Sequence, residues 1–138
     1  MPYQKIILSL AGKAEESNVI REAVRLKKLL NADLSVLHVN DPAAGRAYLM
    51  MDSLPLVTEE DIREMFRQSG YPREAGEIRI NIVEGESCTD EIANATHQAD
   101  LLIVGHRRKN KFLAAFIDST DERVFDMVSC PILVVPMK

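Results

Sequence analysis

The side chains most capable of chemistry gather in one stretch of the second half of the chain. Gly105 and His106 lead into the basic loop Arg107–Lys111, in which Arg107, Arg108, Lys109 and Lys111 are cationic. Cations this dense can bind phosphate through charge-assisted hydrogen bonds. A solvated loop that balances acidic surface elsewhere explains the same residues without a ligand. Both interpretations stay open on sequence alone.

The remaining reactive residue types do not assemble into a catalytic or metal-binding motif. His106 has no nucleophile near it in sequence, and His38 and His97 lack partners at ligand spacing, which favours structural roles for both. Cys88 and Cys130 are far apart and lack a C-x-x-C pattern, as expected for reduced thiols. We therefore expect no catalytic residue, no metal and no enzyme, although weak ATP hydrolysis stays open.

Composition narrows the class of partner. The sequence has 138 residues, 17 basic and 21 acidic side chains and a net charge of −4, so its surface as a whole should repel nucleic acid and anionic membranes. The sequence holds no apolar run of membrane-spanning length, and its first residues lack a signal-peptide pattern. The expected location is the cytoplasm.

Five short apolar segments are expected to form strands. Most are continuous apolar runs, typical of strands covered on both faces, whereas 77–83 alternates apolar with polar residues and should lie at a sheet edge. The segments are 5–10, 34–39, 77–83, 101–104 and 131–136.

Helical patterns separate these strands. They cover residues from Glu15 to Leu30, from Thr58 to about Ser69, from Ser87 to Ala99 and from Phe112 to Val128, with Thr58 and Ser87 as N-caps. A long irregular connection joins the second strand to the second helix. The alternation predicts an α/β fold: one doubly wound, five-stranded, mostly parallel sheet flanked by helices, Rossmann-like, in strand order 3-2-1-4-5. We expect residues 1–138 to form a single domain.

The last strand raises the question of a partner. Ile132–Val135 is as apolar as a central strand, yet the last strand of this fold commonly lies at an edge. A homodimer in which the strand pairs with its copy would cover it. An edge blunted by Pro131 and Pro136 is the alternative.

Ligands of open parallel sheets bind beyond the carboxyl ends of the strands, where the strand order reverses. Here that point lies between the first and fourth strands. Its walls should be Ala11 and its neighbours, Val39 and its neighbours, and the loop that begins at Gly105.

Several local segments together resemble the universal stress protein family over nearly the whole chain. They are the opening strand, Leu37-His38-Val39, Ser69-Gly70-Tyr71-Pro72, the run from Asp100 to His106 and the closing run from Cys130 to Pro136. The Gly-His pair and the Gly-Tyr-Pro turn look most like the universal stress protein A branch, which lacks the ATP-binding glycine motif.

The resemblance implies a motif that this sequence only partly keeps. ATP-binding members carry Gly-x-x-Gly, nine residues and then Gly-Ser or Gly-Thr, where the glycines let backbone amides approach phosphates. Gly105 matches the first glycine, but Arg108 and Asp118 replace the other two before Ser119. The Asp that nucleotide-binding relatives place after the first strand corresponds to Ala11.

The resemblance and these departures lead to one expectation and one alternative. We expect a homodimeric stress-response regulator that binds protein partners, still unidentified, without a cofactor. The alternative is an ATP- or AMP-binding switch with a degenerate phosphate loop over Gly105–Ser119. Its site would be lined by Ala11, Val39, Gly105, His106, Arg107, Arg108, Ser119 and Thr120, and could be empty. Ser119 and Thr120 could instead be phosphorylated or cap a helix.

Overall fold

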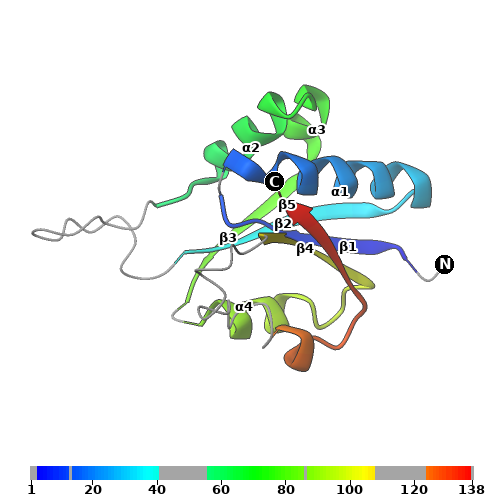
Figure 1. Cartoon of the computed structure of the whole chain (residues 1–138), viewed down its shortest axis with the longest axis vertical. Helices are drawn as coiled ribbons and strands as arrows, with labels where there is room; N and C mark the ends of the chain where they lie inside the picture. Colours follow the sequence, from blue (N-terminus) through cyan, green and yellow to red (C-terminus); the bar gives the residue numbers. More distant parts are fainter. Residues whose placement is uncertain (1–2, 13, 41–55, 86, 108–123, 138) are drawn as a thin grey trace, which may run out of the picture.

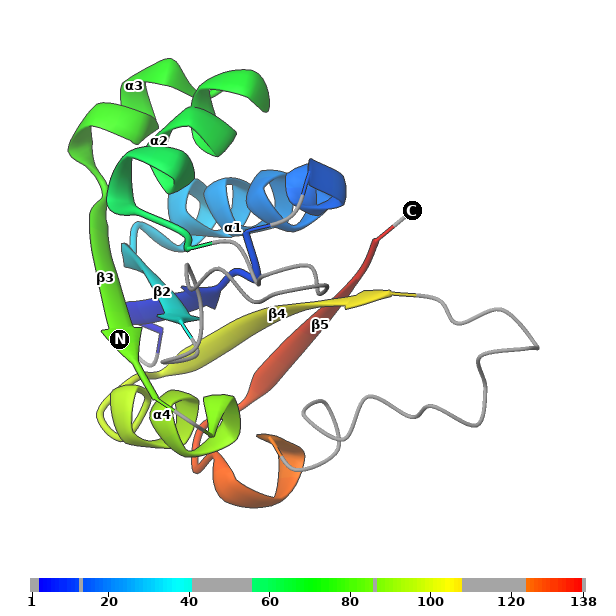
Figure 2. The same ribbon diagram turned by 90° about the vertical axis from the view of Figure 1, so that its left-hand side faces the viewer.

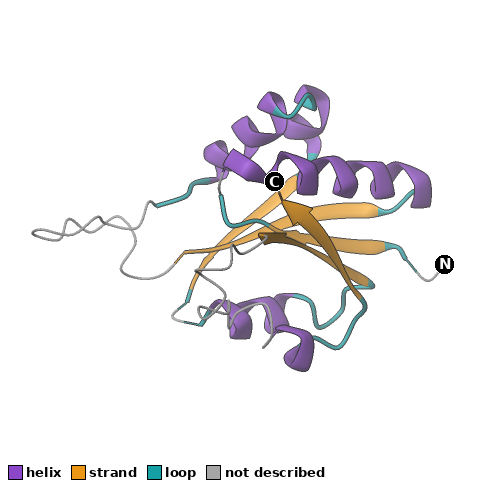
Figure 3. Ribbon diagram, in the orientation of Figure 1, coloured by secondary structure: helices purple, strands orange, loops and turns teal. Residues whose placement is uncertain are grey.

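The protein is built on one parallel β-sheet (Figures 1 and 3). The computed structural model describes residues 3–12, 14–40, 56–85, 87–107 and 124–137. The strands lie in the order β3-β2-β1-β4-β5, and every pairing is parallel. Their bounds are β1 Lys5–Ser9, β2 Asp33–Asn40, β3 Arg79–Glu84, β4 Leu101–Arg107 and β5 Ile132–Met137. The predicted fold class and strand order are confirmed.

Helices α1, α2 and α3 cover one face of the sheet (Figure 1). The short 3-10 helix η1, Ala14–Glu16, leads into α1, Ser17–Leu30, which buries Val19, Ile20, Ala23 and Val24 against the strands. The helix ends at Asn31, whose φ of 52° is left-handed, a conformation that asparagine tolerates. The predicted end of this helix, Leu30, is confirmed.

Helix α2, Glu59–Gln68, begins at the predicted capping box. The Thr58 side chain accepts from the Asp61 backbone N–H, and the Asp61 carboxylate accepts from that of Thr58. A further helix, α3, Pro72–Glu77, follows the Gly70 turn and has its proline in the first turn, where a missing N–H costs nothing. Glu77 therefore ends α3, and the prediction that it opens the third strand is wrong.

The opposite face is covered by α4, Cys88–Ala95, and by a helical turn over residues 124–127, which Figure 2 shows side by side below the strands. Ser87 caps α4 by accepting from the Asp90 N–H. The helix ends at Ala95, short of the predicted Ala99. Residues 112–123 of the last predicted helix lie outside the described residues.

Two groups of buried side chains, one on each face, hold the layers together. On the α1 side, Leu8, Ile20 and Phe66 are among the largest fully buried residues. On the α4 side, Leu37, Ile92, Leu102 and Val124 form the second group. Within the described part of the chain, no helix is both long enough and apolar enough to cross a bilayer.

Candidate functional site

The carboxyl ends of β1, β2 and β4 meet at one edge of the sheet. Ser9, the last residue of β1, lies opposite Leu37 of β2 and Val104 of β4. Val39 and His106 each come two residues later on their strands, so they extend past the end of β1, where Ala11 begins the exposed turn. The structure therefore brings these three sequence-predicted residues to the expected edge.

Gly105, His106 and Arg107 belong to strand β4 rather than to the loop in which they were expected. They pair with Val135, Pro136 and Met137, so the partner strand prolongs β4 by three residues. The apolar run that marked the strand in the sequence ends earlier, at Val104. The remaining predicted site residues, Arg108, Ser119 and Thr120, lie outside the described residues.

The open side of Gly105 is already occupied by other side chains. A Cβ at this position would lie 2.8 Å from Val19 Cγ2 and 3.1 Å from Met137 Sδ. Val39, in contrast, packs with the group on the α4 side. Gly105 and Val39 therefore present their side-chain positions to opposite faces of the sheet. Packing alone accounts for a glycine at position 105.

The backbone at the end of β1 is held by a buried carboxylate. Glu16 of η1 is only 2% exposed, and its Oε2 accepts a hydrogen bond of 2.8 Å from the backbone N–H of Ala11. The sequence placed Glu16 only within the first predicted helix, which begins at Glu15. Gly12, which lies between Ala11 and Glu16 in the sequence, has a φ of +85°.

A second polar group is buried beside the same turn. His38 is 6% exposed, with its Nδ1 atom 2.7 Å from the Leu10 carbonyl oxygen and its Nε2 atom 2.9 Å from Asn40 Oδ1. The structural role predicted for His38 is consistent with this burial, but Asn40 was not singled out. The signal for the pair was present, because His38 and Asn40 alternate in phase with the buried Leu34 and Val36.

The end of β2 is in turn tied to the segment that precedes α2. Asn40 donates from Nδ2 to the Val57 carbonyl oxygen at 2.8 Å, and Asn40 Oδ1 accepts from the Val57 N–H at 3.2 Å. Val57 also fills the space next to Gly12, where an added Cβ would lie 2.7 Å from Val57 Cγ2. Hydrogen bonds and apolar contacts within the chain thus cover this part of the strand edge.

The family comparison agrees with this architecture. The model of the universal stress protein family matches residues 2–136. The chain belongs to the universal stress protein family.

Individual relatives are distant, but they match along almost the whole chain. This universal stress protein is 25% identical over 142 residues to the universal stress protein MJ0531 of Methanocaldococcus jannaschii, covering 96% of this chain and 82% of the relative. A universal stress protein solved in complex with cAMP is 18% identical, with a TM-score of 0.65 and coverage of 99% and 98% of the two chains. One from Archaeoglobus fulgidus, in complex with dAMP, is 16% identical, with a TM-score of 0.55 and full coverage of both chains. At these identities the two structures establish the fold alone.

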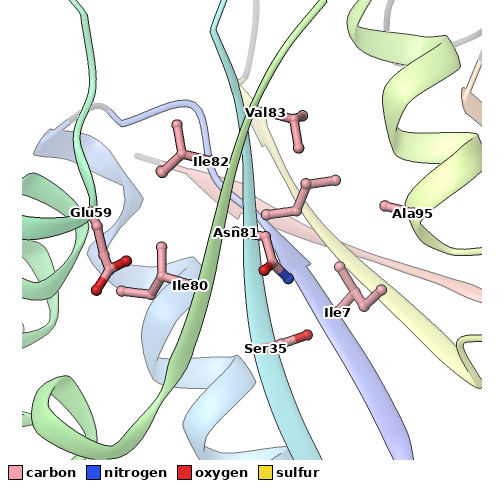
Figure 4. Close-up of a pocket in the computed structure, with 9 residues that line it drawn as sticks. Ile7, Ser35, Glu59, Ile80, Asn81, Ile82, Val83 and Ala95 are labelled. Atoms are coloured by element: carbon pink, nitrogen blue, oxygen red, sulfur yellow. The ribbon is translucent and has the colours of Figure 1, made fainter.

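A cavity of about 560 Å³ lies around β3. Figure 4 shows Ile80 and Ile82 on the side of Glu59, and Asn81 on the side of Ile7 and Ala95. Ser35, Leu37 and Val83 also line it. Of the sequence-predicted site residues that the structure describes, none lines this cavity, so it provides no support for their assignment.

The two thiols and the potential metal ligands suggest no further chemistry. Cys88 and Cys130 form no disulfide, and burial raises the pKa of the Cys130 thiol, which disfavours the reactive thiolate. Among the described residues, no group of three or more His, Cys, Asp or Glu side chains is arranged to hold a metal ion.

Proposed function

We propose that this universal stress protein acts in stress response in the cytoplasm as a non-enzymatic regulator. It works as a homodimer that binds protein partners and needs no nucleotide, as in the branch without the ATP-binding glycine motif. Residues 1–138 form its single domain, and it binds neither nucleic acid nor membrane.

The observation that carries this proposal is that backbone groups at the end of β1 already contact side chains of the same chain. The Ala11 N–H already donates to Glu16, and the adjacent Leu10 carbonyl oxygen already faces His38. Ala11 itself offers no carboxylate to a ligand. Gly105, the one glycine kept from the phosphate-binding pattern, has its open side filled by Val19 and Met137. Contacts within the chain therefore account for Ala11 and Gly105 without a bound nucleotide.

Support for the homodimer comes from the outer edge of β5, which pairs with no further strand among the described residues. In the sheet order β5 is terminal, and Val134 is 38% exposed. Phe125 and Met127, in the helical turn shortly before β5, are also exposed apolar residues. Exposed apolar side chains next to an unpaired strand edge are typical of an interaction surface. A second copy can pair with the segment Ile132–Val135 through the same residues on both chains.

A specific observation favours the second candidate function, an ATP- or AMP-binding switch. Two structurally similar universal stress proteins were solved with cAMP and dAMP. The basic loop Arg107–Lys111 supplies cations that could hold phosphate where the glycines are missing. In this alternative, Ala11, Val39, Gly105, His106, Arg107, Arg108, Ser119 and Thr120 line the site.

Thermal unfolding with ATP, AMP and cAMP separates the two functions. A ligand present at one hundred times its dissociation constant adds about 2.7 kcal/mol to the free energy of unfolding, which is a readily measured shift. We expect no shift with any nucleotide and no nucleotide in the purified protein. A shift with ATP or AMP would replace the proposal by the switch. Loss of that shift in Arg108→Ala would then assign the phosphate contact to the basic loop.

A further inference from the structure

Helix α4 leaves part of the sheet beside it open. The helix ends at Ala95, itself an exposed residue. On the same side of the sheet, Ile7 of β1 and Ser35 of β2 are only half-buried, and Asn81 of β3 is exposed. All four residues line the cavity of about 560 Å³ around β3, a volume within the usual range of small-molecule sites. This side of the cavity is therefore open to solvent and large enough for a small ligand.

Two polar side chains of this side are available to a ligand. Figure 4 shows Ser35 and Asn81, from neighbouring strands, on the side of the sheet where Ala95 lies. Within the described part of the chain, neither side chain is hydrogen-bonded to another protein group. A serine hydroxyl and an asparagine amide can each both donate and accept a hydrogen bond. Together they suit a ligand group that also does both.

Apolar side chains surround these two polar groups. Ile7 is the neighbour of Ser35 in the strand register. Leu37 is in the same way the neighbour of Asn81. The apolar lining on this side of β3 consists of Ile7, Leu37, Val83 and Ala95. A small number of polar groups among apolar ones is the usual composition of a small-molecule site, because the apolar contacts bind the body of the ligand and the polar groups orient it.

The charges around the cavity favour an uncharged ligand. Of the lining residues that the structure describes, only Glu59 is charged, and it lies on the other side of β3. Its carboxylate is already paired with Arg63, at 2.7 Å. Arg79 is the neighbour of Ser35 in the register, but it is exposed and does not line the cavity. A charged ligand would lose hydration here without gaining an opposite charge in the lining.

The Asn81 side chain narrows the ligand further. Its amide carries an acceptor oxygen next to a donor NH₂ group, so the matching ligand group carries a donor next to an acceptor. A carboxamide has this pattern. A carboxylate only accepts and would place oxygen against Asn81 Oδ1, whereas an amidinium only donates and would place N–H against Asn81 Nδ2.

We propose that the α4 side of this cavity binds a small, uncharged carboxamide with an apolar body. The ligand amide pairs with the side chains of Asn81 and Ser35, and its apolar body packs against Ile7, Leu37 and Ala95. Binding is reversible and no covalent bond changes. The cavity shares no described residue with the predicted nucleotide site, so this inference does not depend on the proposed function.

Three ligands of nearly the same shape test the choice of chemistry. Benzamide, benzoate and benzamidinium carry the same phenyl ring and a planar head group, and at neutral pH they are neutral, anionic and cationic. Each is titrated into the intact, isotope-labelled protein and followed by NMR. We expect benzamide to shift the Asn81 side-chain signals in a saturable way and to bind at least about tenfold more tightly than either charged ligand, the effect of one mismatched hydrogen-bonding group. Binding of benzoate or benzamidinium as tight as that of benzamide, or no saturable shift with benzamide, would overturn the proposal.

Two variants test the location of the site. Asn81→Leu removes the donor and acceptor at similar size, and Ala95→Leu fills the apolar part of the cavity. Both residues are exposed, so both variants should fold. We expect each to weaken benzamide binding at least about tenfold.

The matched controls make the same two changes on α4 at residues that do not line the cavity, Asn94→Leu and Ala93→Leu. Both should bind benzamide as wild type does. Unchanged benzamide binding in Asn81→Leu or in Ala95→Leu would overturn the proposed site. No nucleotide is used in these titrations, so their failure is separate from failure of the proposed function.

Discussion

Val19 of α1 packs directly against the backbone of Gly105 in β4. The Val19 Cγ2 atom would be 2.8 Å from a Cβ at position 105, and Met137 of β5 closes the same space from the other side. Helix and sheet therefore come together at a point where only hydrogen fits. Close packing therefore explains why residue 105 is a glycine.

Gly105→Ala should destabilise the protein. The added methyl group has to displace Val19 or Met137, and overpacking of this kind typically costs about 1–3 kcal/mol. Chemical denaturation measures the loss. The matched control is Gly76→Ala in α3, where nothing lies within 4 Å of the new Cβ and the helix propensity of alanine should add up to about 1 kcal/mol. Equal effects of the two substitutions would contradict the packing role of Gly105.

Gly12→Ala should cost more than Gly70→Ala. Both glycines have positive φ, +85° and +97°, so alanine is strained at either by about 1–2 kcal/mol. Only at Gly12 does the new Cβ also meet a side chain, Val57 Cγ2 at 2.7 Å. In a Val57→Ala background the cost of Gly12→Ala should fall toward that of Gly70→Ala. Denaturation of wild type, the three single variants and the Gly12→Ala/Val57→Ala double variant measures this coupling, and simple additivity would refute it.

Asp100 should make stability depend on acid pH. Its Oδ2 accepts from the backbone N–H groups of Lys5 and Gln4, and these bonds hold the pKa of the carboxyl below its ordinary 3.8. A carboxyl whose pKa is lower in the folded state stabilises the protein above the unfolded value. That stabilisation disappears as pH falls through the folded value.

The measurement for Asp100 is the unfolding free energy of wild type and Asp100→Ala from neutral to acid pH. We expect wild type to be more stable at neutral pH and the difference to shrink as the solution is acidified. A difference that stays constant over that range would mean that the carboxylate contributes nothing through its charge.

Val134→Lys should separate the proposed dimer without unfolding the chain. A lysine on the exposed edge of β5 places like charges next to each other when the strand meets its copy. Leu29→Lys in α1, at a side chain that is 68% exposed, is the matched control and should leave the dimer intact. Sedimentation at micromolar concentration distinguishes the two masses. A monomeric wild type would contradict the dimer itself.

The sequence predicted the sheet well because four strands are short apolar runs and β3 alternates apolar with polar residues, and recognisable turn or cap residues bound them. Thr58, Ser87 and Asn31 each perform the terminal role that their residue type favours. The prediction failed where the end of a strand depends on residues that are distant in the sequence. The end of β4 depends on pairing with Val135 through Met137, and no local pattern at His106 records that pairing.

The sequence predicted which sheet edge the candidate residues would reach, but it did not predict the contacts that they make there. Parallel topology alone put Ala11, Val39 and Gly105 at one edge of the sheet. Topology does not record that Glu16 reaches back over the turn, or that Asn40 bonds to a residue 17 positions later in the chain. Such contacts join segments that are far apart in sequence, so they emerge only once the layers are packed.

Of the five strands, the central one, β1, comes first in the order of the chain. Strand β1 has neighbours that begin at Asp33 on one side and at Leu101 on the other. A growing chain can therefore complete the half-sheet of β3, β2 and β1 while the other edge of β1 still lacks its partner. Until the ribosome has delivered β4, that apolar edge is open to wrong pairings. The order of elements along the chain thus makes the arrival of β4 the step that closes the open edge of β1.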